Sequence, residues 1–198
     1  RPFGQVAELT YGTGYDASKL NGEISESSNK RRLFSSYFGA EKEGLMYAQA
    51  ARWLLYLNAF DDTSAKPTKE GKAAAGGQLP SPGAGWLGKL GLVYLCGDNL
   101  FETLLLNLVL INQGEVQHQA KPIWEREYVP SSERVEIIMP DNLAELYTLQ
   151  SRRILLKRTE ERVTSYTLLG GDFFEKENAF FEPMTIWNVP KPAKNKPT

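Results

Sequence analysis

Cysteine and histidine are nearly missing from this sequence. Cys96 is the only cysteine and His118 the only histidine among its 198 residues. One cysteine excludes an intrachain disulfide and a zinc site built from cysteines, and it fits a reducing compartment. One histidine in a polar stretch, with no serine or cysteine nucleophile near it in the sequence, gives no catalytic triad. We therefore expect a cytoplasmic protein with no metal, no cofactor and no catalytic residues.

Long apolar runs and an excess of charge are also missing. No stretch approaches the roughly 18 to 20 unbroken apolar residues of a membrane span. With 23 basic and 24 acidic residues the net charge is -1, so any attraction to nucleic acid must come from local clusters. The length suits a single domain. The chain starts without methionine or a signal peptide and ends in polar, proline-rich residues, and we interpret both ends as cut from a longer protein.

Periodicity predicts one amphipathic helix over residues 43–60. Its apolar positions recur every three or four residues and form one stripe: Met46, Ala50, Trp53, Leu54 and Leu57. Such a stripe packs against a core. Residues 61–85 then lose all periodicity, and a loop of this length is far longer than the typical ~4 to 6 residues. We expect that loop to be disordered in the absence of a partner, because few apolar residues can fix it.

The second half of the chain predicts a mixture of strands and helices. "LGLVYLCG" reads as a buried strand, with Cys96 as a small core residue. Asn99 and Glu102 form a capping box that opens the apolar stretch "NLFETLLLNLVLI", which predicts a central, buried helix. Asp141 is expected to cap a short helix, and residues 152–171 predict two strands about a charged turn. The fold class is therefore α+β, with helices, antiparallel strands and long loops in one domain over residues 1–198.

The glycine-rich stretch "GAGWLGKL" matches two phosphate-binding patterns. Gly83, Gly85 and Gly88 fit G-x-G-x-x-G, and Gly83, Gly88 and Lys89 fit G-x-x-x-x-G-K. Both patterns need a strand before the loop and a helix after it, and the second also needs Ser or Thr after the lysine. Here Leu90 follows Lys89 and no strand precedes Gly83. A nucleotide-binding enzyme using residues 83–89 and a passive structural scaffold stay open as alternatives.

Basic residues beside glycines or apolar side chains suggest contacts with nucleic acid. In "SSNKRRLFSSYFG", three basic residues precede Leu33 and Phe34, a pairing that can grip phosphates and wedge an apolar group against a base. The long loop carries Lys72 and Lys89 among glycines whose bare backbone can approach a sugar-phosphate chain. Lys176 lies between aromatic residues near the far end.

The order of several segments resembles a known family. They are "RPFGQV", "AARWLLYLNAF", the Gly/Lys loop, "GDNLFETLLLNL", "PIWERE", "SRRILL" and "EPMTIW". In this order they resemble the CasA family, the large subunit of the type I-E CRISPR surveillance complex Cascade. The best single signal is residues 97–108, which resemble the family's Gly-x-x-Leu-x-x-Thr-x-Leu-x-Asn run. By this resemblance the chain is an internal part of the large N-terminal domain, without the C-terminal helical bundle.

The resemblance implies a non-enzymatic role in prokaryotic antiviral defence. Family members inspect double-stranded DNA for a protospacer-adjacent motif, contact the guide-RNA 5′ handle, and help recruit a helicase-nuclease, while guide pairing reads the target sequence. A protein that tolerates several such motifs is expected to read the degenerate minor groove. The implied partners are other Cascade subunits, guide RNA, double-stranded target DNA and the helicase-nuclease.

The resemblance also implies two sets of contact residues. A flexible loop over residues 25–36 would meet the guide RNA and the adjacent motif, with Leu33 or Phe34 as its apolar residue; its members are Asn29, Lys30, Arg31, Arg32, Leu33 and Phe34. The glycine-rich loop and a minor-groove lysine, five residues after Gly171, would contact DNA; the candidates are Lys72, Gly76, Gly77, Gly83, Gly85, Lys89 and Lys176.

Overall fold

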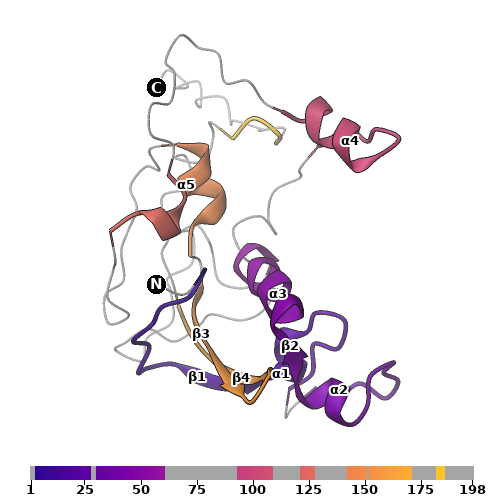
Figure 1. Cartoon of the computed structure of the whole chain (residues 1–198), viewed down its shortest axis with the longest axis vertical. Coiled ribbons are helices and arrows are strands. Elements are labelled where there is room, and N and C mark those ends of the chain that lie inside the picture. The colour runs from indigo at the N-terminus through magenta and orange to yellow at the C-terminus, as the bar shows by residue number, and fades with distance from the viewer. Residues whose placement is uncertain are drawn as a thin grey trace, which may run out of the picture.

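The fold combines short helices with one antiparallel sheet, which confirms the predicted α+β class (Figure 1). The computed structural model describes residues 3–27, 30–60, 93–108, 121–127, 142–150, 152–170 and 182–185. In chain order the elements are β1 (Thr13–Asp16), α1 (Ala17–Leu20), α2 (Ala40–Glu43), β2 (Leu45–Met46), α3 (Tyr47–Phe60), α4 (Leu100–Leu106), the 3-10 turn η2 (Ile123–Glu125), α5 (Leu143–Thr148), β3 (Arg152–Thr159) and β4 (Arg162–Gly170). Within these ranges, no helix has the length and apolar character that a membrane crossing requires.

Strand β4 is the centre of the sheet. β3 pairs with it antiparallel over its whole length, from Arg152 opposite Gly170 to Thr159 opposite Arg162. Because β3 occupies one edge of β4, β1 and β2 share the other edge, where β1 pairs with residues 165–168 and β2 with residues 162–163. The hairpin between β3 and β4 turns at Glu160 and Glu161, as the charged turn predicted.

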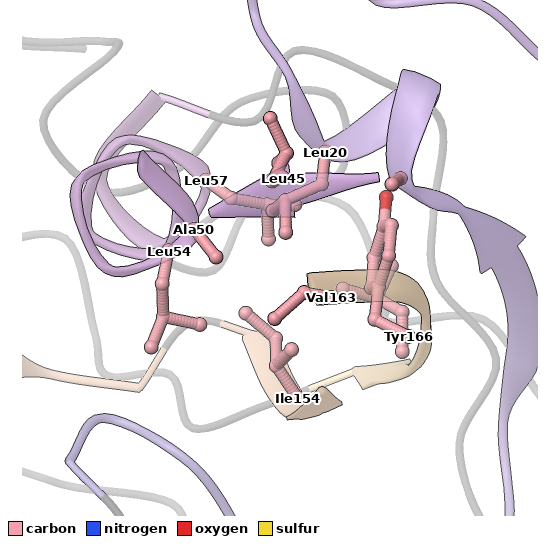
Figure 2. Close-up of a cluster of buried hydrophobic side chains, with 10 residues drawn as sticks. Leu20, Leu45, Ala50, Leu54, Leu57, Ile154, Val163 and Tyr166 are labelled. Carbon is pink, nitrogen blue, oxygen red and sulfur yellow. The ribbon is translucent and has the colours of Figure 1, made fainter. Parts of the chain in front are cut away.

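The two faces of the sheet are covered by different parts of the chain. Alternate strand residues point to opposite faces, so Ile154 and Leu168 enter the main core while their neighbours Leu155 and Leu169 face the other way. Figure 2 shows the main core between α3 and the hairpin; its buried members are Ala17, Leu20, Leu45, Ala50, Leu54, Leu57, Ile154, Val163, Tyr166 and Leu168. Val6 and Leu9 of the N-terminal segment pack on the second face.

Helix α3 presents the predicted stripe to this core. Ala50, Leu54 and Leu57 are buried, and Trp53 is half-buried beside them. The helix begins later than predicted, at Tyr47, because Leu45 and Met46 form β2. The Met46 N–H then donates to Gln49 Oε1 at 2.9 Å, which satisfies one of the free donors at the helix start.

Helix α4 corrects the prediction of a central, buried helix. None of its residues is buried, and Leu100 and Phe101 are 72% and 70% exposed. The predicted strand before it is also wrong in its described part, because residues 93–97 lie outside the sheet and Cys96 is exposed. In Figure 1, α4 stands apart from the sheet and α3. Leucine-rich sequence alone does not bury a helix when no described element covers it.

The polar residues around α4 have a local structural role. Asn99 accepts from the Glu102 N–H at 3.0 Å, and Glu102 Oε2 accepts from the Asp98 N–H at 2.9 Å, which confirms the predicted cap. The Thr103 hydroxyl accepts from the Gly97 N–H at 3.0 Å. The Asn107 amide donates to the Leu95 carbonyl and accepts from the Leu95 N–H, at 2.6 and 2.8 Å. Residues 95–107 therefore close on themselves through polar contacts and leave their leucines outward.

Helix α5 is capped by a different residue from the predicted Asp141, which lies outside the described residues. The Asn142 side chain accepts from the Glu145 N–H at 2.9 Å at the helix start. Leu143 and Leu146 are buried, as their spacing predicts. The Arg126 guanidinium donates to Glu145 Oε1 at 2.6 Å, which joins the η2 segment to the helix.

Candidate nucleic-acid interface

The candidate interface is the segment that leaves the core after α1 and returns at β2. Its N-terminal root is fixed by a buried turn, in which Asn21 and Ile24 are 2% and 1% exposed. The Asn21 carbonyl accepts from the Ser25 N–H at 2.7 Å, and the Ser18 carbonyl accepts from the Glu26 N–H at 3.1 Å. Its C-terminal root is α2 with the Gly44 that follows it. The Ala40 and Gly44 carbonyls both accept from the Arg162 guanidinium of β4 at 3.2 Å. Both ends of the segment are thus held by the body of the protein.

Glu26 joins the two sides of this segment. Its side chain is 5% exposed, and Oε2 lies 2.7 Å from Lys42 Nζ of α2. Its other oxygen, Oε1, accepts from the Arg32 backbone N–H at 3.0 Å. The backbones of Ser27 and Lys30 exchange hydrogen bonds at 3.0 and 3.1 Å. The Glu26 carboxylate therefore binds both α2, through Lys42, and the backbone of the segment, at Arg32.

A second hydrogen bond joins the two sides of the segment. The Tyr37 hydroxyl donates to a carboxylate oxygen of Glu23, and the Tyr37 N–H donates to Ser35 Oγ at 3.2 Å. The bond to Glu23 raises the pKa of the Tyr37 hydroxyl above its usual value, since the nearby carboxylate disfavours a second negative charge. Two independent sets of contacts therefore hold the segment: Glu26 with Arg32 and Lys42, and Glu23 with Tyr37.

Residues 30–34 are the exposed tip of this anchored segment. Leu33 and Phe34 are 93% and 92% exposed, and Lys30, Arg31 and Arg32 are exposed beside them. Burying a large apolar side chain contributes about 1.5 to 3 kcal/mol relative to leaving it exposed to water, and neither Leu33 nor Phe34 gains this in the free protein. Two exposed apolar side chains therefore lie next to three cations on an anchored segment. This surface suits a partner that carries negative charges and flat apolar rings, as nucleic acid does.

Neutralising Glu26 is expected to loosen the tip. The hydrogen bond from Lys42 and the Arg32 N–H hold the pKa of Glu26 below its usual value of 4.5. Because the pKa of Glu26 is lower in the folded than in the unfolded protein, its ionised carboxylate stabilises the fold at neutral pH. This stabilisation is lost as the pH falls through the pKa of the folded protein. Glu26→Gln should therefore speed tryptic cleavage after Lys30, Arg31 or Arg32 several-fold at neutral pH. Glu161→Gln, on the exposed β3–β4 turn, is the matched control, and equal cleavage of both variants would refute the anchor.

The structure describes part of the predicted contact set. Lys30, Arg31, Arg32, Leu33 and Phe34 lie together at the tip, as their sequence neighbourhood predicts. The remaining predicted contact residues lie outside the described residues: Asn29, Lys72, Gly76, Gly77, Gly83, Gly85, Lys89 and Lys176. Their roles stay predictions, and so does the nucleotide-loop alternative over residues 83–89.

Two contacts between residues distant in sequence were not predicted from the sequence. Glu26 and Lys42 are sixteen positions apart, so no local spacing signals their contact. Tyr37 and Glu23 are likewise distant in sequence. In the described ranges, no three His, Cys, Asp or Glu side chains gather in a way that could hold a metal ion.

The comparisons with known proteins agree on one family. The family model of CRISPR-associated protein Cse1 matches residues 1–198. The fold is similar to the crystal structure of Thermobifida fusca Cse1, with 28% identity, a TM-score of 0.64, and 86% of this chain and 32% of that chain covered. It is similar to Cse1 from Acidimicrobium ferrooxidans, with 31% identity, a TM-score of 0.60, and 90% and 33% covered.

A third solved structure, Thermus thermophilus CasA (Cse1), shares 25% identity and a TM-score of 0.61, with 88% of this chain and 33% of that chain covered. No protein of curated function matches the chain. The chain spans about a third of the length of the solved structures that it matches.

Proposed function

Because the chain belongs to the CRISPR-associated Cse1 family, we propose that it forms part of the large subunit of a cytoplasmic Cascade complex and contacts nucleic acid through residues 30–34. The partners of this proposal are the other Cascade subunits, the guide RNA, double-stranded target DNA and the helicase-nuclease. The role is binding and recruitment without chemistry of its own. One observation carries the proposal: two almost fully exposed apolar side chains, Leu33 and Phe34, stand beside three cations on an anchored base.

The chemistry of the tip supports contact with a duplex that is being inspected. Lysine and arginine side chains bind phosphates and set the position of a protein on DNA, but they carry little sequence information. An apolar side chain can enter a base step in the minor groove and locally unstack it. The guide-RNA handle and the adjacent motif both offer such phosphates and bases. We propose that Lys30, Arg31 and Arg32 bind the backbone while Leu33 or Phe34 contacts a base.

The proposal extends to the parts of the contact set outside the described residues. Glycines between residues 76 and 85, with Lys72, Lys89 and Lys176, are proposed to contact the target duplex through backbone and lysine contacts in the minor groove. That groove presents a degenerate pattern, which suits a protein that tolerates several adjacent motifs. A passive scaffold would instead need the loops only for assembly.

The double variant Leu33→Ala/Phe34→Ala tests the proposal. In the full-length protein within the assembled complex, we expect target-duplex affinity to fall about tenfold or more, because an aromatic contact with a base contributes about 1 to 3 kcal/mol. Electrophoretic mobility shifts at fixed salt measure it. Phe38→Ala, another exposed aromatic just after Tyr37, is the matched control.

The scaffold alternative makes the opposite prediction for this variant. It expects poorer assembly and unchanged DNA affinity in those complexes that form. Equal affinities for the double variant and Phe38→Ala would therefore overturn the proposed contact.

A further inference from the structure

A second exposed surface lies on α3 beside the root of the segment. Trp53, Tyr56 and Phe60 follow one another at three- and four-residue spacing, which places them along one side of the helix. The Trp53 and Tyr56 rings meet edge to face, with centroids 5.4 Å apart, and the Tyr56 and Phe60 rings stack at 5.6 Å with an interplanar angle of 29°. Tyr56 and Phe60 are 47% and 39% exposed. Two stacked rings therefore remain open to a further partner.

A shallow hollow adjoins these two rings. It is formed where α3 meets the end of α1 and the buried turn, and it is lined by Lys19, Leu20, Gly22, Ser25, Tyr56, Leu57 and Phe60. Gly22 is required there, because a Cβ at this position would lie 2.3 Å from the Trp53 ring. The hollow has a volume of about 70 Å³, well below the roughly 300 to 1,000 Å³ of sites that enclose a small molecule. It can take one edge of a flat ring whose remainder stays in solvent.

The charge around the hollow favours an anion. Among the described residues that line it, Lys19 is the charged one. Arg52 is the only charged residue of α3, and it lies one helical turn before Tyr56 on the same side. Glu23, the residue after Gly22, directs its carboxylate to the Tyr37 hydroxyl and does not line the hollow. A flat ring attached to a negative group fits this combination of aromatic and basic side chains.

We propose that Tyr56 and Phe60 form a stacking surface for one base of single-stranded RNA, with the adjoining phosphate bound by Lys19. Aromatic side chains next to a basic groove are the general means by which proteins hold single strands. The surface is separate from residues 30–34, although Gly22 and Ser25 belong to the turn from which that segment leaves. The choice of RNA over other polyanions rests on the proposed function, in which the subunit meets the guide.

Binding of fluorescein-labelled oligouridylate to the full-length protein, followed by fluorescence anisotropy at low salt, tests the stacking surface. Tyr56→Ala should weaken binding about tenfold, as loss of one stacked base does. Tyr56→Phe keeps the ring and should bind within about twofold of the unaltered protein, whereas Tyr56→Leu, which keeps apolar volume without a ring, should bind as weakly as the alanine variant. Lys19→Ala should flatten the dependence of log affinity on log salt by about 0.7 for the lost phosphate.

Leu55→Ala is the matched control, because Leu55 is the neighbouring residue on α3, is 50% exposed and does not line the hollow. Thermal unfolding of each variant checks that the fold is intact. If Tyr56→Ala and Tyr56→Leu bind oligouridylate as tightly as Leu55→Ala, the stacking surface is refuted. This readout uses RNA and the single protein, whereas the tip is tested with duplex DNA and the assembled complex, so either can fail without the other.

Discussion

Gly12→Ala is expected to destabilise the fold by about 3 kcal/mol or more, because it combines backbone strain with a direct overlap. Gly12 precedes β1 with a φ of +123°, which side chains other than hydrogen rarely tolerate. A Cβ there would lie 2.3 Å from the Leu168 carbonyl oxygen. That oxygen belongs to the backbone of the central strand, so it cannot move aside as a flexible side chain would.

Thermal unfolding of the Gly12 variant measures this effect. For a chain of this size a loss of 1 kcal/mol lowers the midpoint by about 2 to 4 °C, so the expected drop is about 6 to 12 °C. Gly14→Ala, two residues later in β1, is the matched control, since its Cβ would meet no atom within 4 Å. It should leave stability unchanged or raise it by up to about 1 kcal/mol. Equal midpoints for the two variants would show that β1 does not pair with β4 in the observed register.

Leu54→Ala should cost about 2 to 5 kcal/mol, the range for emptying a buried leucine site. Leu54 is 1% exposed in the main core, and it also contacts the N-terminal segment, where a Cβ on Gly4 would lie 3.1 Å from its Cδ2. Its removal leaves a cavity between α3 and the hairpin, where Figure 2 shows Leu54 above Ile154. Chemical unfolding in urea gives the loss directly.

The neighbouring Leu55 provides the comparison for Leu54. It is half exposed, so Leu55→Ala should change the free energy of unfolding by no more than about 0.5 kcal/mol. A similar loss for both variants would mean that α3 turns a different face to the sheet. The same Leu55 variant serves as the control for RNA binding. Both measurements therefore depend on α3 facing the sheet with Leu54 and solvent with Leu55.

Local patterns predicted most elements of the main core. The stripe on α3 required only a helical period and apolar residues at its positions, and Ala50, Leu54 and Leu57 are buried as expected. The hairpin β3–β4 was marked by a charged turn between two apolar runs. The start of α3 was misjudged because β2 is formed by pairing with β4, a contact that sequence spacing does not encode.

Helix α4 shows why composition misleads. Its leucines predicted burial, yet its polar residues make local contacts: Asn99 caps it, Thr103 binds the Gly97 N–H and Asn107 binds Leu95. A Cβ on Gly97 would lie 2.4 Å from Glu102 Cβ, so a glycine is needed at position 97 for this close approach. The polar residues and the glycine of residues 97–108 therefore close one short unit, and they do not indicate what covers its leucines.

The candidate interface was predictable only at its tip. Three cations followed by Leu33 and Phe34 are visible as a sequence neighbourhood, and their exposure follows from the lack of any helical stripe. The anchor at Glu26 was not predictable, because its partners Arg32 and Lys42 lie six and sixteen positions away. The Tyr56–Phe60 stack was hidden as well, since aromatic residues on an amphipathic helix read as core until the opposite face is known.

The most direct test of the central claim is site-specific photo-crosslinking from the tip. A benzoylphenylalanine placed at position 34 of the full-length protein, within the assembled complex carrying guide RNA and target duplex, reports which molecule lies against the side chain. The account predicts crosslinks to the guide-RNA handle or to the duplex beside the target. The same probe at position 38 should give far fewer. Crosslinks from position 34 that reach only protein subunits would contradict the claim that this loop meets nucleic acid.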